Sequence, residues 1–281
     1  MIKMNYKIID INIDYKKANA EHYGYQPTMT IYLPDNLVEV EPNLIRPTVI
    51  VCPGGGYGGT SKREAEPIAL KLISAGLNAV VVHYSCAPAR FPCQLLELSS
   101  VVAKVRENAE EWHVDTNKIV VMGFSAGGHL AASYGTLWNK DFIKEYFGFK
   151  NGENKPNGMV LCYPVITAGK KAHRGSFVNL LGDRQNDEEL LTLLSPEKQV
   201  SEDTPRAFIW HTFEDDTVPV ENSLLMATAL TEKGISTELH VYPKGCHGLS
   251  LCNDIVCRGY NGAYSETQKW IDEAIRWVKA L

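Results

Sequence analysis

The sequence lacks several features that would place it in other classes of protein. No apolar run approaches the roughly 18 residues of a membrane span, and Met1 to Tyr6 contain no continuous apolar segment typical of a signal peptide. Basic residues are not in excess, because 28 Lys and Arg stand against 33 Asp and Glu, a formal net charge of −5. We therefore expect no membrane insertion and no nucleic-acid partner.

Cysteine is present, but not in the pattern of a disulfide framework or a zinc site. There are seven cysteines, an odd number, and Cys52 and Cys162 lie inside apolar runs. Cys252 and Cys257 have no second pair at the spacing of zinc ligands. These observations predict reduced thiols, a cytoplasmic location and no metal.

What the sequence does contain is an alternation of apolar runs and helical patterns from residue 48 to the end, without a linker. The expected strands cover residues 6–14, 28–33, 47–52, 79–84, 118–123, 158–163, 207–211 and 238–242. The expected helices cover residues 62–75, 92–112, the segment after Ser125, 187–194, 220–233 and 270–278. Such a pattern predicts an α/β fold with a mostly parallel, eight-stranded sheet and helices on both faces. We expect a single domain over residues 1–281, with its ligand beyond the carboxyl ends of the strands.

Two segments have less certain boundaries. Ser61 and Glu64 have the spacing of a capping box, but Pro67 suits a first helical turn, so the helix of residues 62–75 could begin later. Residues 164–205 lack a strong strand signal. We expect them to form a partial lid over the site.

A candidate nucleophile lies in the stretch Gly123-Phe124-Ser125-Ala126-Gly127, between a buried strand and a helix. A serine at such a sharp turn stands clear of the sheet, and the glycines permit close backbone approach. The plainer interpretation is a glycine-rich turn with an ordinary serine. The strand before it and the helix after it favour the nucleophile.

Candidate partners for the serine follow two later strands. The stretch after His211 holds three adjacent acids, Glu214, Asp215 and Asp216, and spacing alone does not choose among them. His247 follows the last strand and is flanked by Gly245 and Gly248. The order serine, acid, histidine is that of a serine hydrolase on this kind of sheet, with the acid orienting the base. A solvated acidic turn and a surface histidine are the plainer alternatives. We expect His129, on the helix after the serine, to be a packed residue.

A glycine cluster, Cys52-Pro-Gly-Gly-Gly-Tyr-Gly-Gly59, follows the first parallel strand. It lacks the G-K-S/T of a phosphate loop. Its glycines instead allow backbone N–H groups to face a developing oxyanion. We expect one donor, or two, from Gly55 and Gly56, and another from Ala126.

Together these stretches resemble the α/β-hydrolase superfamily. Within it they are similar to the bacterial acetyl esterase and acetylxylan esterase-like branch, which is related to the dienelactone hydrolase and prolyl oligopeptidase catalytic domains. The resemblance rests on the glycine cluster, residues 63–69, the stretch 123–131, Tyr163-Pro-Val165 and His247-Gly248. The family pattern H-G-x-x-D-x-x-V-P maps onto residues 211–219 and thereby selects Asp215. Thr212 replaces the usual glycine of that pattern, and Pro53 stands where related lipases carry histidine.

The resemblance implies a serine carboxylesterase that hydrolyses short acyl esters, chiefly acetyl esters of sugars or xylo-oligosaccharides, without a cofactor. Ser125, Asp215 and His247 would be catalytic, with Gly55, Gly56 and Ala126 as oxyanion donors. Tyr57, Tyr163 and Phe213 are candidates to line the substrate pocket, and core packing is the equal alternative for them. The rival functions are a dienelactone-type or peptidase-like hydrolase and a non-catalytic ligand-binding protein of the same fold. The expected partner is a small-molecule ester, and a homo-oligomer is compatible with the sequence.

Overall fold

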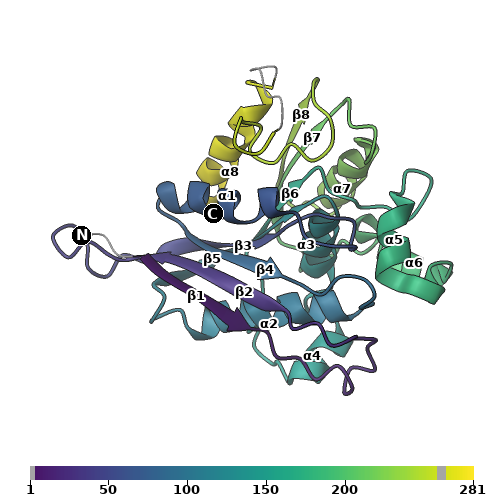
Figure 1. The fold of residues 1–281 in the computed structure, drawn as a ribbon, viewed down its shortest axis with the longest axis horizontal. Coiled ribbons are helices and arrows are strands. Elements are labelled where there is room, and N and C mark those ends of the chain that lie inside the picture. Colours follow the sequence, from purple (N-terminus) through teal and green to yellow (C-terminus); the bar gives the residue numbers. More distant parts are fainter. Residues whose placement is uncertain (1–3, 258–263) are drawn as a thin grey trace.

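The computed structural model describes residues 4–257 and 264–281 and contains one eight-stranded sheet (Figure 1). The strands lie in the order β1-β2-β4-β3-β5-β6-β7-β8. Their bounds are β1 Met4–Asp10, β2 Thr28–Pro34, β3 Arg46–Cys52, β4 Asn78–His83, β5 Val114–Phe124, β6 Gly158–Cys162, β7 Arg206–Thr212 and β8 Thr237–Tyr242. Strand β2 pairs antiparallel with β1 and β4, and every other pairing is parallel. The expected eight strands and mostly parallel sheet are confirmed.

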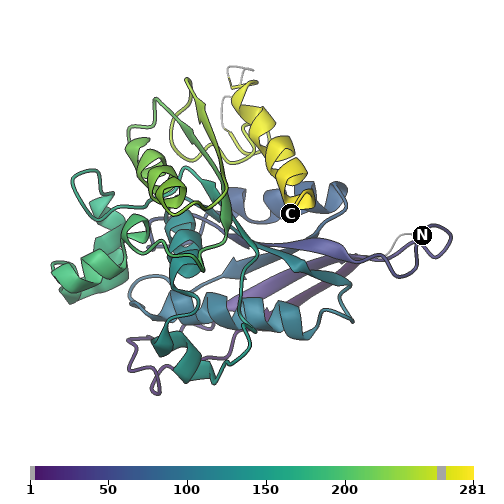
Figure 2. The ribbon, with the colours of Figure 1, turned by 180° about the vertical axis from the view of Figure 1, so that it is seen from behind.

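Helices cover both faces of the sheet, as expected; Figure 2 shows the sheet between α2 on one side and α1 and α8 on the other. The α-helices are α1 Glu66–Ser74, α2 Cys93–Glu107, α3 Ala126–Leu137, α4 Asp141–Phe147, α5 Arg174–Leu181, α6 Glu188–Leu193, α7 Glu221–Glu232 and α8 Trp270–Lys279. Short 3-10 helices are η1 Lys62–Glu64, η2 Gly182–Arg184, η3 Pro196–Lys198 and η4 Thr267–Lys269.

The central strands are apolar on both faces because each face has its own core. In β3, Ile50 and Cys52 point into the core beneath α2, α3 and α7, while Val49 and Val51 point into the core beneath α1 and α8. This alternation follows from the two-residue period of a strand. It explains why the sequence shows continuous apolar runs there rather than alternating ones.

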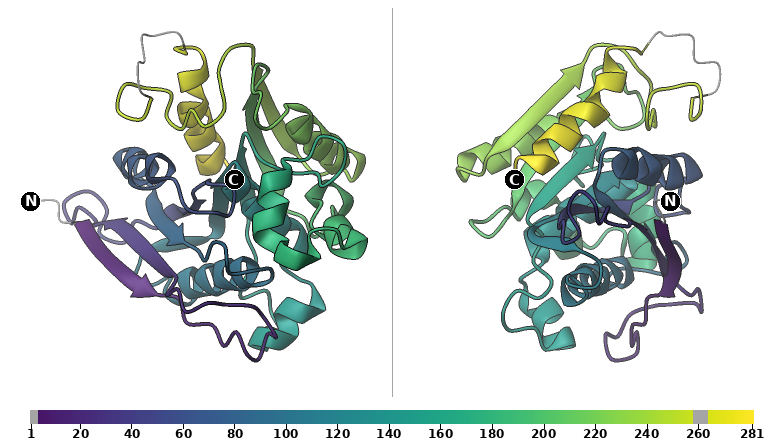
Figure 3. Two further views of the ribbon diagram at one scale, coloured as in Figure 1. Left: turned by 45° about the vertical axis from the view of Figure 1, so that its right-hand side comes forward. Right: turned by 90° about the vertical axis from the view of Figure 1, so that its left-hand side faces the viewer.

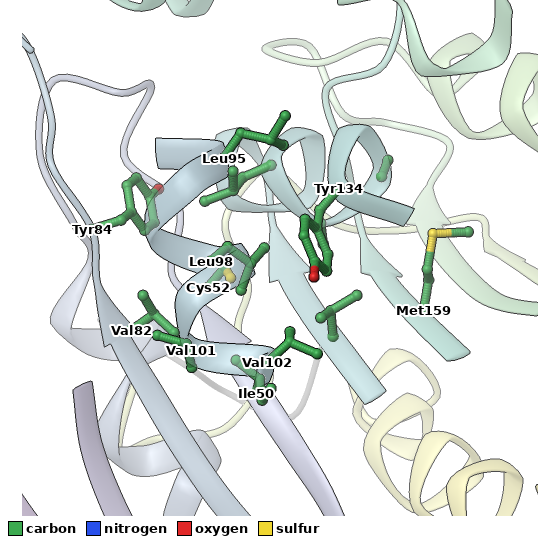
Figure 4. Packing of buried hydrophobic residues seen from close by; sticks show 14 of the residues in the cluster. Ile50, Cys52, Val82, Tyr84, Leu95, Leu98, Val101, Val102, Tyr134 and Met159 are labelled. Atoms are coloured by element: carbon green, nitrogen blue, oxygen red, sulfur yellow. The ribbon is translucent and has the colours of Figure 1, made fainter. Parts of the chain in front are cut away.

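Close packing of helices on these strands fixes the carboxyl edge where the site lies. Figure 4 shows Leu98 of α2 by Cys52 and Val102 of α2 by Ile50, with Tyr134 of α3 to one side. A methyl group at Gly135 of α3 would lie 2.1 Å from Sδ of Met159 in β6. We infer that α3 can approach the sheet so closely because this position has no side chain.

Several element boundaries differ from those expected. The segment 62–75 is divided into η1 and α1, and Pro67 occupies the first turn of α1. The capping box is wrong: Ser61 makes no side-chain cap, and the Glu64 carboxylate turns into the protein instead. Strand β1 ends at Asp10 and α2 ends at Glu107, both earlier than expected. Hydrophobic periodicity locates elements better than it locates their ends, where fraying and tertiary contacts decide.

The segment 164–205 contains α5 and α6 with η2 and η3, although its sequence indicated one short helix. Figures 1 and 3 show α5 and α6 together at the side of the molecule toward which β3 and β4 point. Within the described ranges, no helix combines the length and apolar character needed to cross a bilayer. All seven cysteines lie in those ranges as free thiols.

Candidate active site

Ser125 sits on the turn between β5 and α3 in a backbone conformation that is rare for serine, with φ +53°. Two hydrogen bonds hold this turn: the Ser125 N–H donates to Cys162 O at 3.0 Å, and Val165 N–H donates to Ser125 O at 3.1 Å. A Cβ at Gly123 would lie 2.0 Å from Gly127 O, so the turn requires glycine there. The packing around the turn therefore holds the serine in its strained conformation.

The structure brings Ser125, His247 and Asp215 into one row of hydrogen bonds. Nε2 of His247 lies 2.7 Å from Ser125 Oγ, and Nδ1 lies 2.6 Å from Asp215 Oδ2. The three residues come from the loops after β5, β8 and β7, which end at the same edge of the parallel sheet. The Asp215 carboxylate is fully buried, whereas the His247 side chain remains 17% exposed. The imidazole can therefore exchange protons with solvent or substrate, while the carboxylate cannot.

Asp215 is held by four donors. The N–H groups of Thr217 and Val218 donate to Oδ1 at 3.0 and 2.9 Å. Oδ2 contacts His247 Nδ1 and, at 3.2 Å, Nε2 of the buried His211. Burial by itself raises the pKa of Asp215, but the hydrogen bonds from His211 and His247 outweigh it and hold the pKa well below its usual range. The carboxylate therefore stays ionised through the neutral pH range.

The other two acids of this turn face outward. Glu214 is exposed and pairs with Lys244, whose Nζ lies 2.6 Å from Oε1. Asp216 is exposed, and its Oδ1 accepts from the Thr217 hydroxyl at 3.3 Å. Of the three acids that the sequence left open, Asp215 alone is bonded to His247.

The glycine loop, residues 53–59 after β3, has three of its carbonyl groups held by hydrogen bonds. Gly54 O accepts from Ser61 N–H at 2.8 Å, and Gly55 O accepts from Gly58 N–H at 3.0 Å. Gly56 O accepts from Asn179 Nδ2 of α5 at 2.9 Å. A trans peptide places the next N–H opposite each fixed carbonyl, so these three bonds orient the N–H groups that follow.

Those N–H groups are available as donors. Within the described residues, the N–H groups of Gly55 and Gly56 have no hydrogen-bond partner, whereas Gly54 N–H donates to Glu64 Oε2. Gly55 has φ +135°, and a Cβ there would lie 2.2 Å from Gly59 O. Ala126 is the first residue of α3, where an N–H has no acceptor within the helix. The assignment of Gly55, Gly56 and Ala126 as oxyanion donors stays a prediction.

The pocket assignments from the sequence need correction. Tyr57 and Tyr163 are only 1% and 2% exposed, so neither presents a surface to a substrate. The Tyr57 hydroxyl bonds to Nδ1 of His129 at 2.8 Å, and the Tyr163 hydroxyl bonds to Glu64. Their hydroxyl groups find partners inside the protein, which allows the rings to be buried. Phe213 is 69% exposed and keeps the freedom to contact a ligand.

His129 is a packed residue, as expected. Its Nε2 donates to Leu194 O at 2.8 Å, which leaves Nδ1 to accept from Tyr57. Burial lowers the pKa of His129 to about 4, so the ring is neutral at neutral pH. It joins α3 to the glycine loop and to the segment 164–205.

The sequence did not indicate three residues that support this site. Glu64 had the spacing of a helix cap, Asn179 lies in a segment without a clear pattern, and His211 served only to mark a motif. His211 bonds to Ser223 Oγ through Nδ1 at 2.7 Å, which directs Nε2 toward Asp215 and Val218 O. The contacts of Asn179 with Gly56 and of Glu64 with Tyr163 join residues about a hundred positions apart, so no local spacing could have revealed them, whereas His211 lies only four residues before Asp215.

Solved structures share this architecture over nearly the whole chain. The acetyl ester-xyloside bifunctional hydrolase from Caldicellulosiruptor lactoaceticus is 34% identical, with a TM-score of 0.81 over 98% of this chain and 96% of that one. The carboxylesterase Cest-2923 from Lactobacillus plantarum is 25% identical, with a TM-score of 0.80 over 100% and 97%. Fold and solved relatives define the class: the chain has the α/β-hydrolase fold. It belongs to the BD-FAE family, whose model matches residues 29–230.

Curated relatives include proteins that act on xylan. Endo-1,4-beta-xylanase B of Butyrivibrio fibrisolvens is 40% identical over 253 residues, which are 88% of this chain and 38% of that protein. The acetylxylan esterase of Xylanibacter ruminicola is 28% identical over 238 residues, which are 83% of this chain and 45% of that protein. The chain thus spans less than half the length of these two relatives.

Proposed function

We propose that the chain is a serine carboxylesterase that hydrolyses short acyl esters, chiefly acetyl esters of sugars or xylo-oligosaccharides. The observation that carries this proposal is the unbroken row Ser125 Oγ, His247 and Asp215, with hydrogen bonds of 2.7 and 2.6 Å. A serine hydroxyl becomes nucleophilic when a base removes its proton, and this row places such a base in hydrogen-bonding contact.

In the acylation step, Ser125 Oγ attacks the ester carbonyl carbon while its proton moves to His247 Nε2. Asp215 fixes the ring with Nδ1 protonated and stabilises the imidazolium. The tetrahedral oxyanion is stabilised by the N–H groups of Gly55, Gly56 and Ala126. Its collapse breaks the bond to the alcohol, which leaves with the proton from His247, and the acyl group stays on Ser125.

Deacylation repeats the sequence with water as the nucleophile. His247 Nε2 accepts a proton from water, and the resulting hydroxide attacks the acyl carbon. The second tetrahedral intermediate expels Ser125 Oγ, which recovers its proton from His247. One ester and one water give one acid and one alcohol. Every proton transferred passes through Nε2, so no cofactor is required by this route.

The substrate class rests on the relatives. One solved relative is described as an acetyl ester-xyloside hydrolase and one curated relative as an acetylxylan esterase, and the former matches this chain over nearly its full length. We propose that a sugar hydroxyl is the leaving group on this basis. The seven free thiols support the further proposal that the protein works in a reducing compartment, as expected for the cytoplasm.

A substrate panel tests the proposal. It comprises 4-nitrophenyl acetate, butyrate and octanoate, acetylated xylo-oligosaccharides and aminoacyl anilides, with kcat/KM measured for each. We expect the highest kcat/KM for acetyl esters, a decline with acyl length, and release of acetate from the oligosaccharides. Turnover of the anilides would instead favour a peptidase. Ligand binding without any turnover would favour a non-catalytic binding protein.

A further prediction concerns the segment 164–205, which we propose acts as a partial lid that supports the glycine loop. Replacing Asn179 by alanine removes the donor to Gly56 O, so the loop loses one of the three hydrogen bonds that hold its carbonyl groups and, with it, part of the rigidity around the Gly55 and Gly56 N–H groups. We expect kcat for 4-nitrophenyl acetate to fall roughly tenfold, less than the loss of a direct oxyanion donor. KM should change little, because the donors act mainly on the transition state.

The matched control for this variant is Val178→Ala, one residue earlier on α5, where the side chain is 39% exposed. Val178→Ala should leave kcat unchanged. Equal kcat for the two variants would show that Asn179 does not support the loop.

A further inference from the structure

Glu64 is a buried carboxylate that the mechanism above does not use. Its residue is 3% exposed, and its two oxygens accept from different loops of the site. Oε2 accepts from Gly54 N–H at 2.8 Å, at the start of the glycine loop. A Cβ at Gly54 would lie 2.8 Å from this oxygen and 3.0 Å from Ser125 Cβ, so carboxylate and nucleophile flank the same point.

The other oxygen leads to the histidine loop. The Tyr163 hydroxyl donates to Glu64 Oε1 at 2.6 Å and accepts from Ser250 N–H at 3.0 Å. Ser250 lies three residues after His247, and its own hydroxyl donates to Arg63 O at 2.6 Å. The Tyr163 ring also meets the His247 ring edge to face, with centroids 5.1 Å apart. Glu64 is therefore joined to the loops after β3, β6 and β8.

The hydrogen bonds around Glu64 favour its ionised form. Gly54 N–H can only donate, and the Tyr163 oxygen already accepts from Ser250, so both carboxylate oxygens act as acceptors. A length of 2.6 Å is typical of a hydroxyl bonded to an ionised oxygen, for which about 2.5–2.7 Å is usual. Burial raises the pKa of Glu64, while the bonds from Tyr163 and Gly54 and the charge of protonated His247 oppose that rise. The charge of the Glu64 carboxylate thus interacts with that of the protonated His247 imidazole.

The charged and titratable groups around His247 come from several elements. Asp215 is bonded to Nδ1, the Tyr163 ring meets the imidazole edge to face, and His173, just before α5, is near enough to interact with it electrostatically. Arg63, the residue before Glu64 in η1, brings a positive charge to the same loop: its Nη2 lies 3.4 Å from where a Cβ of Gly248 would stand. Glu64 thus adds a second negative charge behind Tyr163, alongside that of Asp215.

We propose that Glu64 is a positioning residue of the esterase, holding the glycine loop and the histidine loop in register and stabilising the imidazolium of His247 by its charge. The proposal rests on the proposed function only for its effect on turnover. Its electrostatic part concerns the imidazole itself and can be measured without a substrate.

The variant Glu64→Gln removes the charge and keeps the shape of the side chain. The amide oxygen can keep the bond from Gly54 N–H, whereas the amide nitrogen then faces the Tyr163 hydroxyl, which loses its acceptor. Tyr163→Phe, described below, measures the loss of that second contact separately. We expect the acid limb of the kcat/KM profile to move down by about half a pH unit to one unit. The plateau of kcat/KM should fall by about three- to tenfold, because the same stabilisation is lost from the transition state.

Two further variants complete the test. Glu66→Gln removes an equal charge from an exposed residue two positions away. It should leave both the acid limb and the plateau of the kcat/KM profile unchanged. Tyr163→Phe keeps the charge but removes the link to Ser250 N–H. We expect it to lower kcat roughly tenfold through a displaced His247, without moving the acid limb.

The reading that does not depend on turnover is the titration of the His247 ring, followed by NMR of the imidazole Cε1 proton and assigned with His247→Gln. Its midpoint should move down in Glu64→Gln and stay in place in Glu66→Gln. An unmoved midpoint in Glu64→Gln would overturn the electrostatic role, whatever happens to activity or thermal stability. Unchanged kcat per titrated active site in Tyr163→Phe would overturn the positional role.

Discussion

Replacing Ser125 by alanine is expected to lower kcat for 4-nitrophenyl acetate by roughly 10⁵- to 10⁶-fold, because it removes the hydroxyl that His247 Nε2 contacts. The remaining turnover would come from the oxyanion donors and from substrate binding. The fold should persist, because the backbone bonds that hold this turn do not involve the hydroxyl. The measurement is kcat, together with the thermal midpoint of unfolding.

The matched control for this variant is Ser133→Ala on the same helix. Ser133 is 2% exposed, and its hydroxyl has no hydrogen-bond partner within the described residues. We expect this substitution to change neither kcat nor stability appreciably. Substantial esterase activity in Ser125→Ala would mean that a different nucleophile performs the reaction.

Replacing Asp215 by asparagine should lower kcat by about 10⁴-fold through the wrong tautomer of His247. The N–H groups of Thr217 and Val218 both need an acceptor at Oδ1, so the amide oxygen will occupy that position. The amide NH₂ then faces His247 Nδ1, which must accept. The ring consequently carries its proton on Nε2 and cannot take the proton of Ser125.

The comparison variant for Asp215 is Asp216→Asn, which carries the same chemical change on the adjacent exposed residue. We expect it to change kcat less than about twofold, as is usual for a surface substitution away from the chemistry. If Asp216→Asn were the more damaging of the two, the orienting carboxylate would have been wrongly assigned.

Stability should also respond to pH through Asp215. Its pKa is depressed in the folded protein, so its contribution to stability is present above the pKa of the unfolded chain, about 3.9. That contribution is lost as the pH falls toward the folded value. The difference in unfolding free energy between wild type and Asp215→Asn should therefore shrink below about pH 4. Denaturant unfolding at pH 7 and at pH 3 measures this change.

The order of apolar runs and helical patterns along the sequence predicted much of the fold. Continuous apolar runs in β3, β4 and β5 indicated strands covered on both faces, and the structure has those strands in one mostly parallel sheet. The G-x-S-x-G turn and the later histidine were recognisable because their chemistry requires fixed neighbours: glycines that permit close approach and a turn that ends a strand. Where the signal was local, the prediction was specific.

Spacing along the chain did not separate Glu214, Asp215 and Asp216, and only the resemblance to a family selected Asp215. In the structure, the three side chains point in different directions. Glu214 and Asp216 point outward, and Glu214 pairs with Lys244. Asp215 points inward and contacts His247 and His211. Similarly, Tyr57 and Tyr163 were aromatic residues at strand ends that could equally face substrate or core. In the structure both rings are buried, and their hydroxyl groups are hydrogen-bonded to His129 and Glu64.

The sequence by itself determined that this is an α/β protein with a serine on a strand-to-helix turn, because hydrophobic period and glycine placement are local properties. Residue spacing alone left open which acid meets His247 and which donors of the glycine loop stay free, and the tertiary structure decided both. It also decided that Glu64 joins three loops rather than capping a helix. Those outcomes depend on contacts between residues as far apart as 64, 163 and 250, and the energy of such a contact is set by where the packed sheet places both partners.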